Sequence, residues 1–141
     1  MEKKLKSLLM LIKVDANNVF DRISSRQAEY VSEFSLKRTR DHFNNIFRNR
    51  FEGLSIEAMV GLDPEIIVAA DNFYQELDRL HWYLMHTQDM TNTVEDNVGI
   101  SVKLLKKNLD LLLLYTDQEV LSDQIEEGDL ENLEIEDMSI E

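Results

Sequence analysis

Residues 36–51 combine positive charge with aromatic rings, which makes them the stretch best suited to binding chemistry in this 141-residue sequence. They read LKRTRDHFNNIFRNRF and hold three phenylalanines, one histidine and five basic residues, which are Lys37, Arg38, Arg40, Arg48 and Arg50. Positive side chains attract phosphates, and exposed aromatic rings can stack on bases. The stretch therefore raises the question of whether the chain binds a nucleic acid.

Helical periodicity argues against a nucleic-acid site in this stretch. On a helix, four of its apolar side chains lie within ~100° of one another, namely Leu36, Phe43, Ile46 and Phe47. Phenylalanines in such a core stripe cannot stack on bases, and the net charge of −13 repels phosphates at long range. The sequence therefore predicts no direct nucleic-acid binding. It predicts instead that the five basic side chains meet carboxylates of this chain or of a partner.

The histidines and carboxylates form neither a metal-site motif nor a catalytic motif. Asp78 and His81 have the i, i+3 spacing found in carboxylate-bridged metal sites, but such sites need a second pair, and the sequence has none. Cysteine is absent, and neither a glycine-rich phosphate loop nor a His-Glu-x-x-His motif occurs. We therefore expect no enzymatic activity, no cofactor and no metal. His81 is expected to be a core or half-buried residue with a hydrogen bond.

Composition predicts an all-α protein. Proline occurs once and glycine four times, which is too few for the many turns of a sheet protein. Hydrophobic residues make up 43% of the chain, enough to form the core of one domain. Apolar periodicity and capping signals, among them a capping box at Ser24 and the pair Asp63-Pro64, delimit five helices. These are expected at residues 3–23, 24–51, 55–61, 64–88 and 93–121, the second being either a separate helix or a kinked continuation of the first.

The expected helices predict an antiparallel helical bundle of four main helices plus one short helix over residues 1–121, followed by an acidic C-terminal tail over residues 122–141. From Asp117 to the end there are 11 acidic residues and no basic one, whereas residues 1–50 carry a net charge of +5. Because like charges repel, the tail is expected to be disordered alone or to act as a docking segment for a basic groove.

The helix expected at residues 93–121 has more apolar surface than one bundle needs. A heptad-like core seam is formed by Val98, Val102, Leu105, Leu109, Leu112 and Thr116. A second stripe lies ~100° around the helix. It consists of Ile100, Leu104, Leu111 and Tyr115, with Leu113 and Leu114 beside it. Either this helix is packed on two sides within its own bundle, or the second stripe binds a partner or a second copy.

Trp82 is the other residue that the periodicity singles out. It lies ~160° from the core face of the helix expected at residues 64–88, close to Asp71 and Asp78. An indole ring in polar surroundings is either covered by another part of the fold or exposed as an interface anchor. The sequence leaves both possibilities open.

These observations favour a non-catalytic protein–protein interaction module, an adaptor, regulator or assembly component. It is expected to self-associate through its last predicted helix as a homodimer and to use the acidic tail as a docking segment. The alternative is an acidic inhibitor that mimics nucleic acid and blocks a basic cleft on a nucleic-acid-binding protein. No apolar run is long enough to cross a membrane, and the start of the chain lacks a cleavage site, so we expect a cytoplasmic protein.

Overall fold

The structure is a computed structural model that describes the backbone of residues 3–27 and 40–140 and the side chains as far as residue 122. Its elements, in chain order, are α1 (Lys3–Ser25), α3 (Phe43–Ile46), the 3₁₀ helix η1 (Phe51–Gly53), α4 (Ile56–Met59), α5 (Pro64–His86) and α6 (Thr91–Ile140). No strand occurs among the described residues. The predicted all-α class is therefore confirmed.

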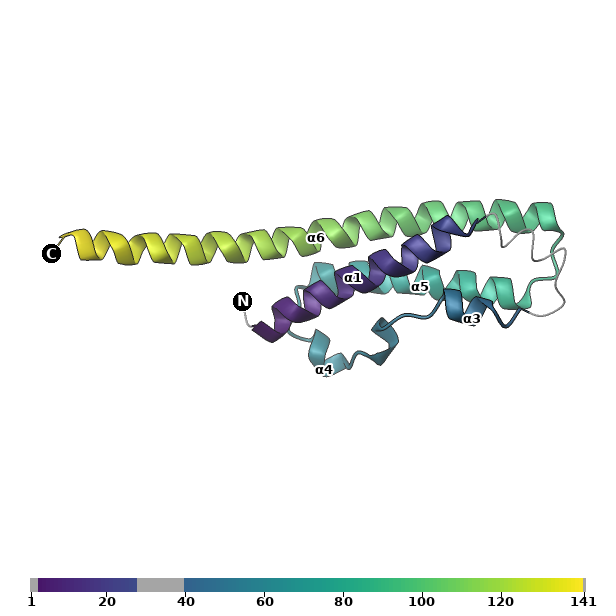
Figure 1. Ribbon diagram of the computed structural model, residues 1–141, viewed down its shortest axis with the longest axis horizontal. Coiled ribbons are helices and arrows are strands. Elements are labelled where there is room, and N and C mark those ends of the chain that lie inside the picture. The colour runs from purple at the N-terminus through teal and green to yellow at the C-terminus, as the bar shows by residue number, and fades with distance from the viewer. Residues whose placement is uncertain (1–2, 28–39, 141) are drawn as a thin grey trace.

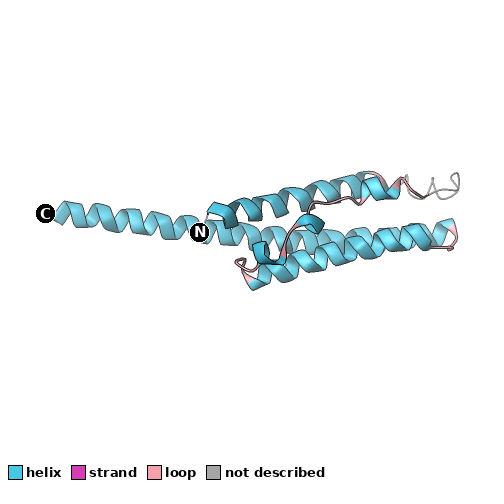
Figure 2. Cartoon of the chain, turned by 90° about the horizontal axis from the view of Figure 1, so that it is seen from below, coloured by secondary structure: helices cyan, strands magenta, loops and turns pink. Residues whose placement is uncertain are grey.

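Three long helices form the body of the molecule. Figures 1 and 2 show α1, α5 and α6 side by side, with α6 packed against both of the others. The short connection at residues 87–90 makes α6 run antiparallel to α5. It also runs antiparallel to α1, because Lys13 meets Asp117 while the earlier Lys106 lies over the ring of Phe20.

The helix predicted over residues 24–51 is wrong in the part that the structure describes. Ser24 lies inside α1, which continues to Ser25, so it does not cap a new helix. From residue 40 onward only α3 is α-helical before η1 begins, while residues 28–39 lie outside the described part of the chain. The side chain of Asn49 explains the break, because it donates to the carbonyl of Phe47 and accepts from the backbone N–H of Glu52. Such local bonds compete with helical ones.

The starts of α4 and α5 agree with the capping signals. Asp63 precedes Pro64 and accepts a hydrogen bond from the N–H of Glu65 at 3.3 Å. Ser55 accepts one from the N–H of Ala58 at 3.1 Å. Each cap supplies an acceptor for an N–H group that the first turn of a helix leaves unpaired, which fixes where the helix begins.

The core lies between the three long helices and is closed at one side by α3 and the chain that follows it. The seam predicted on α6 is its central wall, since Val98, Leu105, Leu109 and Leu112 are all buried. They face residues of α1 and α5 such as Val19 and Phe73, which are fully buried. Among the described side chains, the last buried one along the chain is Thr116. Val120 is partly buried and still packs against the core, so the body extends at least to that residue.

Helix α6 does not end at Leu121, as the sequence pattern had predicted, but continues to Ile140. Figures 1 and 2 show this final part projecting past the ends of the other helices. The acidic residues after Asp117 thus follow the body without a break in the backbone helix. The division of the chain into a bundle and an acidic tail remains a prediction.

Candidate interaction surfaces

The basic residues of the 36–51 stretch have different roles where the structure describes them. Lys37 and Arg38 lie outside the described residues. Arg40 is half-buried, and its Nη1 donates to the backbone carbonyl of Leu84 at 3.2 Å, which attaches this segment to the end of α5. Arg48 and Arg50 are exposed.

Arg48 and Arg50 are brought together with a third arginine that the sequence pattern had not indicated. Arg22 of α1 lines the same cavity of about 380 Å³, together with Asp15. Its guanidinium donates to the backbone carbonyls of Ile46 and Arg48. Arg22 was missed because it lies in another helix, and only the folding of residues 46–50 against α1 makes them neighbours. The positive charge here is partly used to hold that segment in place.

Asp15 is the buried acceptor that fixes the same segment. Its Oδ2 accepts from the hydroxyl of Tyr74 at 2.7 Å, and its Oδ1 accepts from the backbone N–H of Arg50 at 3.0 Å. The ring of Phe51 stacks on Tyr74 with centroids 4.1 Å apart. Burial, the hydrogen bond to Asp15 and the charge of Asp15 all raise the pKa of Tyr74. This cluster connects α1, α5 and the chain before η1, which is a structural role.

His81 is half-buried and hydrogen-bonded, as predicted. Its Nε2 lies 2.9 Å from Oδ1 of Asn44, and its ring stacks on Phe47 with centroids 4.8 Å apart. Burial lowers the pKa of His81, and the carboxylates of Asp78 and Glu52 oppose that shift. Within the described residues no group of three histidine, aspartate or glutamate side chains is placed to hold a metal ion.

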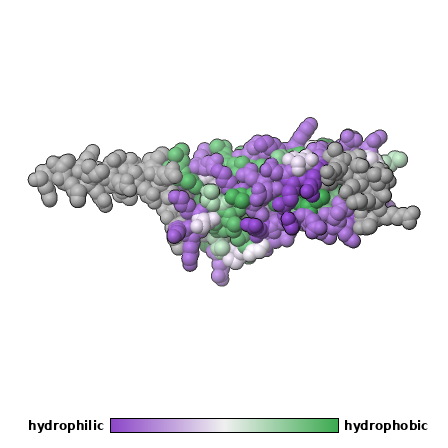
Figure 3. All heavy atoms as spheres, in the orientation of Figure 1, coloured by the Kyte–Doolittle hydropathy of each residue, from purple (hydrophilic) through white to green (hydrophobic). Residues whose placement is uncertain are grey.

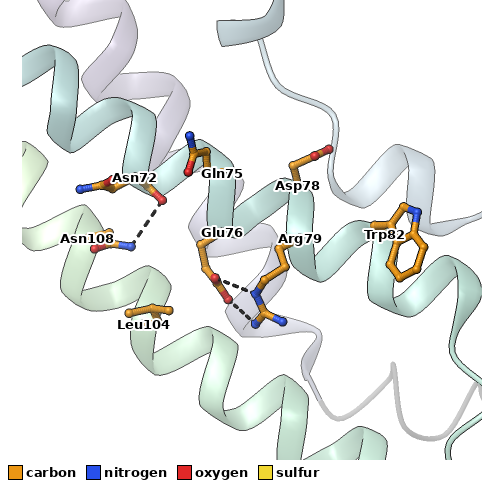
Figure 4. A pocket seen from close by; sticks show the side chains of 8 residues that line it. All are labelled: Asn72, Gln75, Glu76, Asp78, Arg79, Trp82, Leu104 and Asn108. Atoms are coloured by element: carbon orange, nitrogen blue, oxygen red, sulfur yellow. Dashed lines mark hydrogen bonds and ion pairs between the residues drawn. The ribbon is translucent and has the colours of Figure 1, made fainter.

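A groove of about 590 Å³ runs between α5 and α6 (Figure 4). Trp82 stands at one end of it and is 64% exposed, so it is not covered by another part of the described fold, and its role as an interface anchor stays a prediction. The indole ring stacks on His86 with centroids 4.6 Å apart. The other lining residues are Asn72, Gln75, Glu76, Asp78, Arg79, Leu104 and Asn108. The groove thus joins Trp82 to Leu104 of the second stripe on α6.

A charged pair of α5, Glu76 and Arg79, is hydrogen-bonded to Ser101 of α6 in this groove. Glu76 is buried and receives hydrogen bonds from Arg79 at 2.6 and 2.9 Å and from the hydroxyl of Ser101 at 2.7 Å. Burial alone would raise the pKa of Glu76, but the bonds from Arg79 and Ser101 and the charge of Arg79 lower it overall. Figure 4 shows the two bonds between Glu76 and Arg79.

Replacing Glu76 with glutamine is expected to lower the free energy of unfolding at pH 7 by about 1 kcal/mol, because a charge-assisted bond is lost while the exposed guanidinium returns to water. Since the folded pKa lies below the ordinary 4.5, the stabilisation is present above that pH and is lost as the pH falls further. Urea unfolding at pH 7 and pH 3 checks this. The difference between the two proteins should shrink at pH 3, whereas exposed Glu57→Gln, which changes only a charge in the first turn of α4, should show a smaller effect at pH 7.

The outer face of α6 carries a row of exposed apolar side chains that we call the outer seam. It consists of Ile100, Leu104, Leu111, Leu114 and Leu121, which are 63%, 39%, 38%, 49% and 56% exposed. Tyr115 of the second stripe is instead partly buried and packs against the core. Leu121 was missed because the stripe had been projected on a straight 3.6-residue helix. Figure 3 shows apolar patches within a largely hydrophilic surface on one face of the molecule.

The spacing of the outer seam is that of a coiled coil. Its members, with Lys107 and Gln118 in the intervening places, follow alternating steps of four and three residues from Ile100 to Leu121. The opposite side of the helix is already buried against α1 and α5. The seam is therefore a second heptad face on a helix whose first face is occupied.

Comparisons of the chain with protein families, with curated proteins and with solved structures find no match. None of the helices in the described part of the chain combines the length and the apolar character needed to span a bilayer.

Proposed function

We propose that this chain is a non-catalytic protein–protein interaction module that binds another helix along the outer seam of α6. The observation that supports it most strongly is the heptad order of five exposed apolar side chains on one continuous helix. Exposed apolar residues scattered singly are common on protein surfaces, but a row with coiled-coil spacing is the form that a partner helix recognises.

The seam also has the features of a selective surface. Fully burying an exposed leucine or isoleucine contributes about 1.5–3 kcal/mol, so half-exposed members still contribute substantially. Lys107 and Gln118 place polar groups within the seam, and such groups fix register at some cost in affinity. Trp82 and Arg79 line the same groove as Leu104, which widens the surface. Tryptophan and arginine are frequent anchors at protein interfaces.

The acidic end of the chain supports a second element of this proposal. Residues 122–141 carry nine acidic residues and no basic one, and α6 extends them beyond the body. We propose that they act as a docking segment for a basic surface. The alternative function, an acidic inhibitor that mimics nucleic acid, rests on this same projection. Binding that collapses at raised salt indicates that the acidic segment carries it, as a docking segment or as an inhibitor, whereas binding that survives it favours the seam.

The double substitution Leu111→Glu and Leu114→Glu is expected to weaken association of the chain, with itself or with another protein, by about 100-fold or more, because it places charges in an apolar interface. Both side chains are exposed, so circular dichroism and the urea midpoint should stay near those of the wild type. Light scattering of the pure protein and co-purification from its own cells measure the association.

The matched control is Met10→Glu with Val14→Glu, which makes the same charge change at two exposed apolar positions of α1. This variant should keep the associations of the wild type. If the seam variant also keeps all of them, the proposed function is wrong.

A further inference from the structure

We infer that the helix bound at the outer seam is α6 of a second copy of the chain, lying antiparallel with its centre between Leu111 and Leu114. This inference rests on the proposed function, because it names the partner of the same seam. It starts from the order in which apolar and polar residues follow one another.

The outer seam is self-complementary when it is reversed about that centre. In antiparallel alignment, Leu111 meets Leu114 of the second copy, and Lys107 meets Gln118. Leu104 then meets Leu121. The next step outward pairs the sequence positions of Ile100 and Ile125. Every apolar position thus faces an apolar one, and the two polar positions face each other.

A parallel pair would place each seam residue opposite its own copy. Lys107 would then face Lys107 in the middle of an apolar interface, and the acidic residues that follow Asp117 would lie beside their copies. Two ammonium groups in such a place repel and lose hydration. Antiparallel pairing avoids both costs. Each Lys107 then faces Gln118, and the acidic ends point in opposite directions.

The charges that flank the seam are compatible with this arrangement. Antiparallel alignment brings Asp110 of one copy near Asp117 of the other, which would be unfavourable if both carboxylates were unpaired. Each is neutralised within its own copy, since Lys106 lies 3.0 Å from Asp110 and Lys13 lies 2.7 Å from Asp117. The remaining cost is therefore small.

The packing of the body leaves room for the second copy. Leu105, Leu109 and Leu112 lie on the opposite side of α6, which is buried in the core, and α5 borders the seam at Leu104, where the two helices form the groove. The interface has the same residues on both sides and closes after two copies, as a twofold dimer requires. From residue 100 to residue 125 it extends over about 38 Å of helix.

The absence of cysteine from the chain permits a direct test by disulfide mapping. Leu104→Cys and Leu121→Cys are prepared separately, mixed, and oxidised gently. The mixed disulfide is expected to exceed either symmetric one by about tenfold, because only the mixed pair brings the two Cα atoms within reach. Exposed Met10→Cys, mixed with either variant, is the control and should show no such preference. Light scattering of the wild type should give twice 16.5 kDa.

Two results would overturn the inference. One is a symmetric disulfide formed by Leu104→Cys alone as readily as the mixed one, which indicates parallel pairing. The other is a wild type that stays monomeric at high concentration. If the chain is monomeric but the variant with Glu at 111 and 114 loses a co-purifying protein, this inference fails while the proposed function stands. If neither association nor co-purification depends on the seam, both fail.

Discussion

Replacing Asp15 with alanine is expected to lower the free energy of unfolding by about 3 kcal/mol, because it leaves one buried and one part-buried donor without an acceptor. These donors are the hydroxyl of Tyr74 and the backbone N–H of Arg50, at 2.7 and 3.0 Å from the carboxylate. A domain of this size has a total stability of only about 5–15 kcal/mol. Urea unfolding at pH 7, followed by circular dichroism, measures the loss.

Tyr74→Phe is the matched control for Asp15→Ala. It removes one of the two hydrogen bonds and leaves the carboxylate with Arg50, so a loss of about 1 kcal/mol is expected. If Asp15→Ala costs no more than Tyr74→Phe, then Asp15 does not fasten the segment at residues 47–53 to the body.

Alkaline pH gives an independent test of the same cluster. The folded pKa of Tyr74 lies above the ordinary 10.0, so the tyrosine ionises more readily in the unfolded chain. Its contribution to stability is therefore complete below pH 10 and is lost as the pH rises above that value. Unfolding between pH 9 and pH 11 should show a decline in the wild type that is weaker in Tyr74→Phe. An equal decline in both proteins contradicts the assignment.

The long helices of the body could be predicted because local signals agree with one another there. In α5 the cap at Asp63, the proline after it and the apolar period all indicate the same helix. The segment at residues 47–53 could not be predicted in this way. Its path depends on the carboxylate of Asp15, which is 35 residues away in the chain and accepts from the backbone N–H of Arg50. The periodicity of apolar residues along the sequence does not indicate such a long-range hydrogen bond.

The outer seam shows the same limit within a single helix. The sequence identified Ile100, Leu104 and Leu111 as surplus apolar surface, and the structure leaves them exposed. Which other side chains of α6 belong to this exposed surface depends on the position of α5. Tyr115 packs against the core, whereas Leu121 is exposed. A heptad row drifts by about 20° per repeat around a straight helix. A fixed helical projection therefore selects Tyr115 where a coiled-coil period selects Leu114 and Leu121.

Deleting residues 122–141 is expected to weaken self-association by about tenfold to hundredfold while the body stays folded. The reason is that the proposed twofold dimer loses, at each of its two ends, the apolar pair formed by position 100 of one copy and position 125 of the other. The described side chains that are buried or pack against the core end at Val120, which this deletion keeps, so cooperative unfolding should persist. Sedimentation equilibrium at about 0.5 M salt measures the association with charge repulsion largely screened.

Deleting residues 126–141 is the matched control, because it keeps Ile125 and removes eight acidic residues where the longer deletion removes nine. The net charge falls from −13 to −5 in the control and to −4 in the longer deletion, so the two proteins repel their copies almost equally. The control should associate at least as tightly as the full chain, since it loses acidic residues but no seam position. Equal weakening in both deletions would mean that the acidic segment, and not the seam, holds the copies together. Unfolding of the longer deletion would mean that residues 122–141 belong to the core, and the division at residue 121 would then be wrong.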